Sequence, residues 1–333
     1  MKELFYLFQS YLDDPDITDV NYNGRMLWLD HLKKGRYRDD TFCDDEIEQF
    51  CFQVANRLNL PFNVTNPLLE AETEDMRISI LHPSVSKSGI SISIRKTPAV
   101  QRLSRSMLIK EKYAPAALLD FLKLAVQKGC NIMVGGLPGV GKTELIKFLA
   151  SYIPSHQRII TIEDTLELRH HIIHPASDCV ALKVNERFTY SDAIKASLRQ
   201  KPDWLLVSEI RSHEVVYLLE AVSTGAHLLS TIHCSQAASI PKRMIQMFPD
   251  GYAQLEAKLE MMYEAVDIGV YLQASVTDNG IRRQIAEAVV FTNEAHLCST
   301  MIYDGQKLSL EELPKPLYKK LYPMKERRKK TCS

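Results

Sequence analysis

One run of eight residues limits what this chain can fold into more than any other feature. The run is Gly136-Leu137-Pro138-Gly139-Val140-Gly141-Lys142-Thr143, which fits the phosphate-loop template G-x-x-x-x-G-K-[ST]. The segment 131–134 before it is typical of a short buried strand, and 144–150 after it is typical of an amphipathic helix. Glycines let successive backbone N–H groups surround a phosphate, and the helix N-terminus adds partial positive charge. The run therefore predicts nucleotide binding; a glycine-rich turn without a ligand is the alternative.

The template also assigns chemistry to individual residues. Lys142 is expected to reach the β- and γ-phosphates, and the Thr143 hydroxyl is expected to ligate Mg²⁺. ATP and Mg²⁺ are therefore the predicted cofactors. The residues predicted to line the nucleotide are Gly136, Pro138, Gly139, Val140, Gly141, Lys142, Thr143 and Glu144.

Bulk properties narrow the class of protein. A length of 333 residues suggests about two domains. The net charge is zero, so no overall electrostatic field attracts the chain to nucleic acid or lipid. The seven cysteines form an odd set without a C-x-x-C pair, which indicates reduced thiols rather than disulfides or a zinc ribbon. No apolar stretch approaches the 18 residues that a membrane-spanning helix needs. The apolar segment 4–8 after Met1-Lys2-Glu3 is too short, and the start too acidic, for a signal peptide. We expect a protein that is cytoplasmic or held at a membrane by its partners.

Residues 1–98 are predicted to form a smaller mixed α/β domain. Asn23-Gly24 joins two strand-like segments at 16–22 and 25–29, a strong hairpin signal. A helix is expected at 44–58, with further strands at 77–81 and 90–94. The charged stretch 99–112, which follows Pro98, is predicted to be an interdomain linker.

Residues 113–333 are predicted to form a larger α/β domain with a mainly parallel sheet, because strand-like and helix-like segments alternate. A hairpin with its turn near Asn279-Gly280 and a basic tail, at about 314–333, are expected to follow. The helices are expected at 118–128, 191–199 and 215–222, and the strands at 158–162, 204–207, 227–232, 267–273 and 282–291.

Two acids follow predicted strands of this domain. Glu209 ends the apolar segment 205–207, and Glu163-Asp164 follows 158–162. Strand ends at one edge of a parallel sheet face a common crevice, so Glu163 and Glu209 are expected to converge on one nucleotide. There they would order Mg²⁺ and the attacking water. The alternatives are an exposed strand end for Glu209 and a helix or turn cap at Glu163-Asp164.

Two histidines lie at either end of the strand predicted at 227–232. His233 follows the C-terminal end, so it is better placed for a γ-phosphate contact than His227. The run 169–174 holds three more histidines, but no cysteine or acid spacing there supports a metal site.

Together these motifs resemble the secretion ATPases of type II and type IV systems. The chain is most similar to the branch that contains conjugation and Tad-pilus motors, and the resemblance covers most of its length. The motifs that carry it are 16–20 with Asn23-Gly24, 66–69 with Arg77, 93–96, the phosphate loop, the acid box 162–168, the segments 198–203 and 207–211, and Thr224-Gly225 through His233.

The resemblance implies a RecA-like P-loop motor domain, a mobile N-terminal domain and a ring of six subunits that holds ATP between the domains. It implies that Glu209 and Glu163 position Mg²⁺ and water, and that His233 senses the γ-phosphate. Arg77 and Arg95 lie at the family's arginine positions, where charge neutralisation at the nucleotide is expected; ordinary exposed strand arginines are the alternative. Arg211 is a further candidate for charge neutralisation, and pairing between domains or subunits is the favoured alternative.

Three departures from the family pattern stand out. In Thr224-Gly225-Ala226-His227 the first histidine is displaced by one position, and on a strand such a slip moves the side chain to the other face. Trp204 stands where an arginine commonly follows Pro-Asp. The tetracysteine zinc module is missing, which argues against the type II extension-motor branch.

The function expected from the resemblance is a hexameric ATPase that powers a secretion, conjugation or pilus-assembly machine. Its partners would be inner-membrane platform or secretion-channel proteins, with no direct sequence-specific nucleic acid contact. We expect it to be cytoplasmic and peripheral to the cytoplasmic membrane. The basic residues of 315–330 favour an anionic surface or nucleic acid; a solvated tail is the alternative.

Two rival functions stay open at this point. A RecA-like motor acting directly on DNA is possible because one fold hosts many functions. A regulatory nucleotide-binding scaffold that hydrolyses little is the other. The sequence does not identify the cargo.

Overall fold

The computed structural model describes residues 2–249, 253–277, 280–293 and 296–323. The chain divides into two compact units, Met1–Ala99 with Ser275–Arg282, and Val100–Ala274 with Arg283–Ser333. The stretch predicted as a linker, 99–112, contains helix α3 (Arg105–Lys110), which belongs to the second unit. Grouping of 275–282 with the first unit was not foreseen from the sequence.

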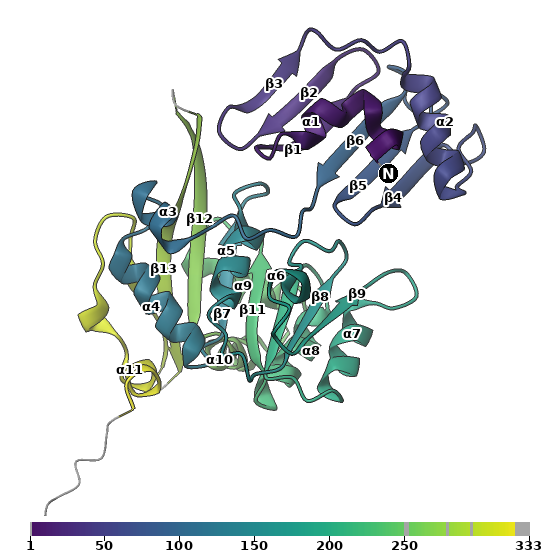
Figure 1. Cartoon of the computed structure of the whole chain (residues 1–333). Coiled ribbons are helices and arrows are strands. Elements are labelled where there is room, and N and C mark those ends of the chain that lie inside the picture. Colours follow the sequence, from purple (N-terminus) through teal and green to yellow (C-terminus); the bar gives the residue numbers. More distant parts are fainter. Residues whose placement is uncertain (1, 250–252, 278–279, 294–295, 324–333) are drawn as a thin grey trace, which may run out of the picture. The chain divides into compact units, whose positions relative to one another are not determined.

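The first unit is built on a six-stranded sheet in the order β3-β2-β1-β6-β5-β4, in which every neighbouring pair is antiparallel. The elements of this unit carry the labels η1, α1, α2 and β1–β6, part of which Figure 1 marks. Its aromatic and aliphatic core includes Phe8, Phe50 and Ile78. The elements are η1 (Lys2–Phe8), α1 (Gln9–Asp13), β1 (Ile17–Tyr22), β2 (Leu27–His31), β3 (Gly35–Asp39), α2 (Ile47–Leu58), β4 (Leu68–Glu72), β5 (Met76–Leu81) and β6 (Ser91–Lys96).

The β1–β2 turn forms where Asn23-Gly24 predicted it. The Asn23 side-chain oxygen accepts hydrogen bonds from the backbone N–H groups of Arg25 and Met26. Gly24 has a φ of +92°, and a Cβ there would lie 2.3 Å from the Ser88 carbonyl oxygen. Only glycine fits this turn, because both the backbone angle and the close approach exclude a side chain.

The second unit is built on an eight-stranded sheet in the order β14-β13-β12-β7-β11-β10-β8-β9. The pairs from β12 through β9 in this order are all parallel, whereas β13 and β14 are antiparallel. This confirms the predicted α/β class with a mainly parallel sheet. The strands are β7 (Ile132–Gly136), β8 (Ile159–Glu163), β9 (Cys179–Lys183), β10 (Trp204–Ile210), β11 (His227–Ile232), β12 (Ile268–Thr277), β13 (Gly280–Asn293) and β14 (Leu297–Tyr303).

Helices cover both faces of this sheet, so its strands are apolar on both sides. In β7, Ile132 and Val134 join the core on one face, and Met133 joins the core on the other. The first face is covered by α3, α4 (Ala116–Gln127), α5 (Lys142–Ala150) and α11 (Lys315–Leu321); the second is covered by α7 (Tyr190–Leu198), α8 (Glu214–Ser223), α9 (Ile240–Ile245) and α10 (Leu255–Ala265). The short elements α6 (His170–Ile173), η2 (Ala237–Ser239) and η3 (Leu310–Glu312) complete the unit.

Two predictions fall partly outside the described residues. The predicted hairpin strands appear as β12 and β13, but residue 279 of the predicted turn is not described. The basic tail is described only to residue 323, and within that part α11 forms.

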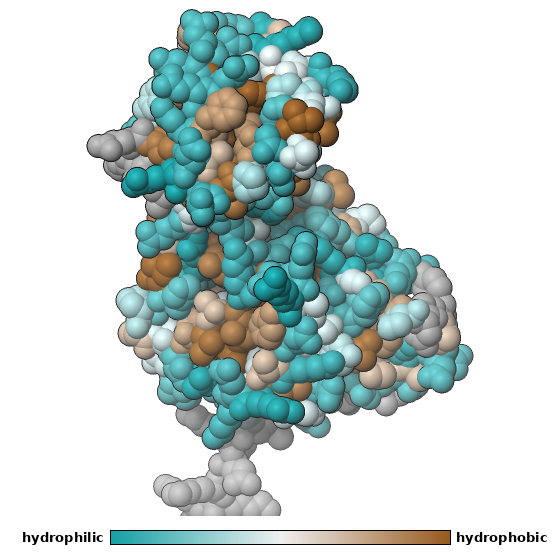
Figure 2. Space-filling view, turned by 90° about the vertical axis from the view of Figure 1, so that its right-hand side faces the viewer, coloured by the Kyte–Doolittle hydropathy of each residue, from teal (hydrophilic) through white to brown (hydrophobic). Residues whose placement is uncertain are grey.

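The surface is mostly hydrophilic on the face shown in Figure 2, where apolar residues gather in a few patches. None of the described helices combines the length and the apolar character that crossing a bilayer would require.

Candidate nucleotide site

The phosphate loop connects β7 to α5 at the carboxyl edge of the parallel sheet. Gly139 and Gly141 have φ angles of +76° and +95°, which L side chains rarely adopt. A Cβ at Gly136 would lie 2.8 Å from Val140 and 2.9 Å from the Leu272 carbonyl oxygen. The glycines of the template are therefore required by backbone angle or by space, as a phosphate cradle demands.

Lys142 begins α5, and its ammonium group folds back over the loop. The Nζ atom donates hydrogen bonds to the carbonyl oxygens of Gly136 and Leu137, at 3.0 and 3.1 Å, and lies 3.2 Å from His233 Nδ1. The side chain is buried, and burial lowers the pKa of Lys142 because it disfavours the cation; the charge of Glu209 opposes this effect. Phosphate oxygens can replace the two carbonyls as partners of this cation.

His233 connects this lysine to Glu209. Its Nε2 atom lies 2.9 Å from Glu209 Oε1. Since a carboxylate only accepts, Nε2 carries the proton and donates it to Glu209. Its Nδ1 atom lies 3.2 Å from Lys142 Nζ and 3.2 Å from the Gly136 carbonyl oxygen, so the same ring also contacts the phosphate loop. His233 thus contacts the phosphate loop, and its contact with a γ-phosphate stays a prediction.

Arg211 continues the network to a third strand end. Its guanidinium donates to Glu209 Oε2 at 2.9 Å and to Asp164 Oδ2 at 2.7 Å. The bond to Glu209 raises the pKa of Arg211, although burial works against it. Pairing between domains or subunits was expected for this residue; the structure instead pairs it inside the second unit. A continuous chain of polar contacts thus runs from the phosphate loop to the ends of β10 and β8.

Glu163 does not join this network, although the sequence predicted that it would converge with Glu209 on the nucleotide. Its Oε2 atom accepts hydrogen bonds from the backbone N–H groups of Glu167 and Leu168, at 2.7 and 2.8 Å. The residue is 1% exposed, and burial raises its pKa to about 7. This geometry corresponds to the turn-cap alternative, because the carboxylate that ends β8 satisfies the amides of the turn that follows it.

The oxygen donors that suit Mg²⁺ at this edge are the Thr143 hydroxyl, in the first turn of α5, and the Glu209 carboxylate. Both Glu209 oxygens are engaged, by His233 and by Arg211. Each of these oxygens accepts one hydrogen bond and keeps a second lone pair, so the Glu209 carboxylate can still ligate Mg²⁺. For Glu163, the third predicted ligand, one oxygen is already committed to backbone amides.

Arg77 and Arg95 lie in the first unit, directly opposite each other on β5 and β6. Arg95 pairs with Asp19 at 2.7 Å, and Arg77 pairs with Glu70 at 3.6 Å. Both guanidinium side chains are exposed, at 60% and 46%. Like charges on facing positions repel, and the two acids offset that repulsion. Exposed pairs of this kind contribute only about 0–1 kcal/mol, so they exchange readily.

His227 begins β11, at the opposite end of that strand from His233. Its ring lies 5.0 Å from that of Trp204, and a Cβ at Gly129 would clash with it at 2.4 Å. Trp204 is fully buried and donates from Nε1 to Gln157. The displaced histidine is therefore a packing residue, and the unusual tryptophan is its partner.

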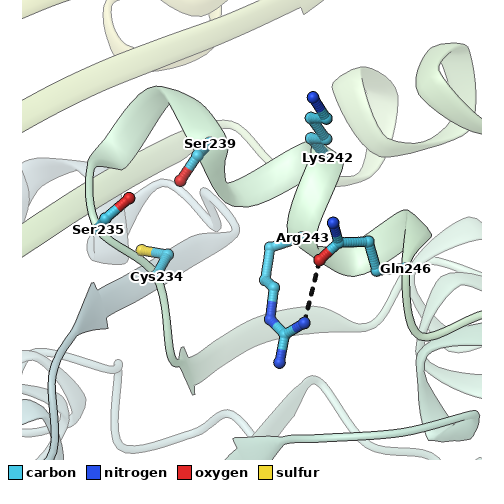
Figure 3. Close-up of a pocket in the computed structure, with 6 residues that line it drawn as sticks. All are labelled: Cys234, Ser235, Ser239, Lys242, Arg243 and Gln246. Atoms are coloured by element: carbon cyan, nitrogen blue, oxygen red, sulfur yellow. Dashed lines mark hydrogen bonds between the residues drawn. The ribbon is translucent and has the colours of Figure 1, made fainter.

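Two further groups of side chains that could bind a ligand, a pocket and a cluster of potential metal ligands, were not predicted from the sequence. Cys234, which follows His233, lines a pocket of about 200 Å³ with Ser235, Ser239, Lys242, Arg243 and Gln246 (Figure 3). In the first unit Asp14, Asp16 and His31 bring three potential metal ligands together. His31 Nδ1, however, accepts from the backbone N–H groups of residues 33 and 34, so its Nε2 carries the proton and is unsuited to bind a metal.

The phosphate loop lies between a parallel strand and a helix, and an acid lies near the end of β10, the second strand from β7 in the sheet. This arrangement defines a P-loop NTPase unit. The model of the family described as "Type II/IV secretion system protein" matches residues 63–306, well over half of the chain. The chain belongs to this family.

Individual relatives agree with the assignment. A type IV secretion system protein, PtlH of Bordetella pertussis, is 28% identical over 318 residues, which cover 83% of this chain and 91% of PtlH. An uncharacterized protein of Bacillus anthracis is 30% identical over 251 residues, which cover 74% of this chain. The chain spans about half the length of the first relatives it matches, 56% of the B. anthracis protein and 43% of an uncharacterized protein of Methanocaldococcus jannaschii.

Solved structures share the fold. The pilus retraction motor PilT with bound ADP aligns with a TM-score of 0.65 at 21% identity, over 89% of this chain and 84% of that one. The Legionella pneumophila ATPase DotB aligns with a TM-score of 0.60 at 17% identity, over 87% and 80%.

Proposed function

We propose that this protein is a Mg²⁺-dependent ATP hydrolase that powers a type IV secretion, conjugation or pilus-assembly machine at the cytoplasmic membrane. The observation that carries the proposal is the continuous contact chain from Lys142 through His233 to Glu209. It joins a phosphate cradle to a carboxylate, the two parts that ATP hydrolysis requires.

In this mechanism Lys142 leaves the two loop carbonyls and binds the β- and γ-phosphate oxygens. Backbone N–H groups of the loop and of the first turn of α5 hold the remaining phosphate oxygens. Mg²⁺ would neutralise phosphate charge while Thr143 and Glu209 hold it. When Lys142 turns to the phosphates, its contact with His233 Nδ1 breaks. Because His233 also contacts Glu209, binding of the γ-phosphate changes the position of the Glu209 carboxylate through this histidine.

Glu209 then orients the attacking water. Arg211 holds the Glu209 carboxylate in place, because its guanidinium donates both to Glu209 and to Asp164 at the end of β8. Arg77 and Arg95 are proposed to neutralise phosphate charge by exchanging their weak surface pairs for the nucleotide, in the same or a neighbouring subunit. Glu163 supports the site by holding the turn at 167–168.

The biological setting is proposed from the family and its members. A type IV secretion protein, PtlH, and the conjugal transfer protein TrbB of Rhizobium radiobacter both match more than four fifths of this chain. We propose a homohexamer that works with inner-membrane platform or channel proteins, in which hydrolysis drives motion of the N-terminal domain.

Turnover of the purified full-length protein with and without Mg²⁺ tests the chemistry. Lys142→Ala should lose ATP binding and turnover together. Glu209→Gln should keep ATP binding but lose on the order of 10²–10⁴-fold in rate, the usual scale for a positioned base. Glu220→Gln is the matched control, because Glu220 is exposed on α8 of the same unit.

Wild-type turnover in Glu209→Gln would contradict the assigned role. Strong stimulation of turnover by DNA that disappears with added salt would instead indicate a motor acting directly on nucleic acid. Light scattering with ATP tests the hexamer.

A further inference from the structure

A pocket of about 200 Å³ opens between helix α9 and the segment that connects β11 to η2, and we call it the η2–α9 pocket. A single water needs only roughly 10–15 Å³ of such space, so the pocket has room for a small molecule or ion. The residues that line it are Cys234, Ser235, Ser239, Lys242, Arg243 and Gln246. Their polar groups are two hydroxyls, a thiol, an amide and two cations, and none of the six side chains is acidic.

Both walls of the pocket are held by buried neighbours. Helix α9 buries Ile240, Met244 and Ile245 completely, so the other side of the helix, which carries its pocket residues, keeps a fixed orientation. On the opposite wall, the backbone N–H of Ala237 in η2 donates to the Glu287 carboxylate of β13 at 2.7 Å. The pocket is therefore a preformed part of the second unit.

Lys242 and Arg243 make the pocket positively charged. Both side chains are exposed, and within the part of the chain that the structure describes neither pairs with an acid. Arg243 Nη1 instead donates to Gln246 Oε1 at 3.0 Å, which holds the guanidinium beside the pocket and leaves most of its five N–H donors for a ligand. Two neighbouring cations repel each other, so binding of an anion between them is favourable.

The facing wall adds small polar groups. Figure 3 shows Cys234, Ser235 and Ser239 on one side of the pocket, and Arg243 and Gln246 on the other. Ser239 Oγ already donates to the Gln236 carbonyl oxygen at 2.8 Å, so the Ser235 hydroxyl is the one that can donate to a ligand. A hydroxyl thus faces a guanidinium across a space large enough for a small anion.

This set of donors fits a phosphate group better than a carboxylate. A guanidinium binds two phosphate oxygens at once, and an ammonium adds a compact positive charge. A monoanion would neutralise only one of the two cations, whereas a dianion neutralises both. We propose that the η2–α9 pocket binds the dianion of a phosphate group, either inorganic phosphate or a phosphomonoester.

The pocket shares a wall with the strand that leads into the phosphate loop. Cys234 directly follows His233, and a Cβ at Gly135 of β7 would lie 2.2 Å from Cys234 Sγ. The thiol therefore lies between the pocket and β7. A ligand that contacts this thiol is one residue away from the histidine that joins Lys142 to Glu209.

Alkylation of Cys234 measures occupancy, because its thiol lines the pocket. The full-length protein is treated with the neutral reagent iodoacetamide at increasing phosphate and constant ionic strength, and each cysteine is followed by mass spectrometry. At a phosphate concentration of about ten times Kd, alkylation of Cys234 should slow roughly 10-fold, since only the unoccupied fraction reacts. Cys43, which is exposed in the first unit, should react at an unchanged rate.

Other anions separate specific binding from screening. Acetate and chloride at the same ionic strength should not protect Cys234, and protection by either equal to that by phosphate would overturn the proposal. In a second arm O-phosphoserine replaces inorganic phosphate. The anion that protects at the lower concentration identifies the ligand as free phosphate or as a phosphomonoester.

Two variants test the cations. Lys242→Gln and Arg243→Gln should each raise the phosphate concentration for half-protection about 10-fold, the value of one charge-assisted hydrogen bond. Arg57→Gln on α2 and Lys319→Gln on α11 are the matched controls, because both are exposed cations on helices, and they should leave that concentration unchanged.

The phosphate loop is the other place where phosphate could bind, and Lys142→Ala removes its cation. Protection of Cys234 should persist in Lys142→Ala. If protection is lost in Lys142→Ala but kept in Arg243→Gln, phosphate binds only at the phosphate loop and the proposal fails. A wild-type protein whose Cys234 is not protected at any phosphate concentration would also overturn it.

Discussion

Replacing Glu163 by glutamine should change how the stability of the second unit depends on pH. The carboxyl group is 1% exposed, and burial raises its pKa from 4.5 to about 7. A raised carboxyl pKa means that the folded state holds the proton more tightly than the unfolded state. The stabilisation is therefore complete below pH 4.5 and is lost as the pH rises through 7.

The size of the effect follows from the shift. A difference of about 2.5 pH units corresponds to about 3 kcal/mol at roughly 1.4 kcal/mol per unit. Glutamine cannot ionise, and its single Oε1 can accept from both backbone amides, as Oε2 does in the wild type. The free energy of unfolding of Glu163→Gln, relative to wild type, should therefore rise by about 3 kcal/mol between pH 4.5 and 8.

Urea unfolding followed by tryptophan fluorescence measures this difference. The chain has two tryptophans, Trp28 in the first unit and Trp204 in the second, so a Trp28→Phe background makes Trp204 the only reporter. Glu220→Gln in the same background is the control and should show no such trend. A stability difference that stays flat from pH 5 to 8 would refute the burial argument.

Two more substitutions test the packing that supports the site. Trp204→Ala should cost about 3–5 kcal/mol, because the ring is fully buried between the core and His227 and its N–H is paired; urea unfolding followed by circular dichroism that gave less than about 1 kcal/mol would contradict this role. Gly135→Ala places a methyl group 2.2 Å from Cys234 Sγ, so it should destabilise the protein by about 1–3 kcal/mol, and adding Cys234→Ala should recover most of the loss. A double variant that melts no higher than Gly135→Ala alone would show that the thiol is not the obstacle.

Sequence and structure agree most closely where the signal is local. The glycines of the phosphate loop and Asn23-Gly24 specify backbone angles that few other residues adopt, so their turns could be predicted from neighbouring residues alone. Apolar runs buried on both sides predicted the parallel strands, because such runs can be satisfied only between two helix layers. The family pattern was carried by the same short motifs.

Some side-chain roles depended on residues far apart in the chain. Arg211 bridges to Asp164, 47 positions away, and this pairing became visible only once β8 and β10 lay side by side. For Glu163 the sequence left open a role at the nucleotide and a role as a turn cap. In the structure its carboxylate accepts hydrogen bonds from the backbone N–H groups of residues 167 and 168, which is the turn cap. His227 was recognised as displaced, but its contact with Trp204 required the register of β10 against β11.

The sequence by itself therefore determined the phosphate loop, the alternating α/β architecture and the family. The tertiary structure decided which acid meets His233, where Arg211 pairs, and that Arg283 lies beside Gly141 of the loop. The physical reason is range: backbone angles and burial patterns are set by near neighbours, whereas hydrogen-bond partners at a site come from strands that only the folded sheet brings together.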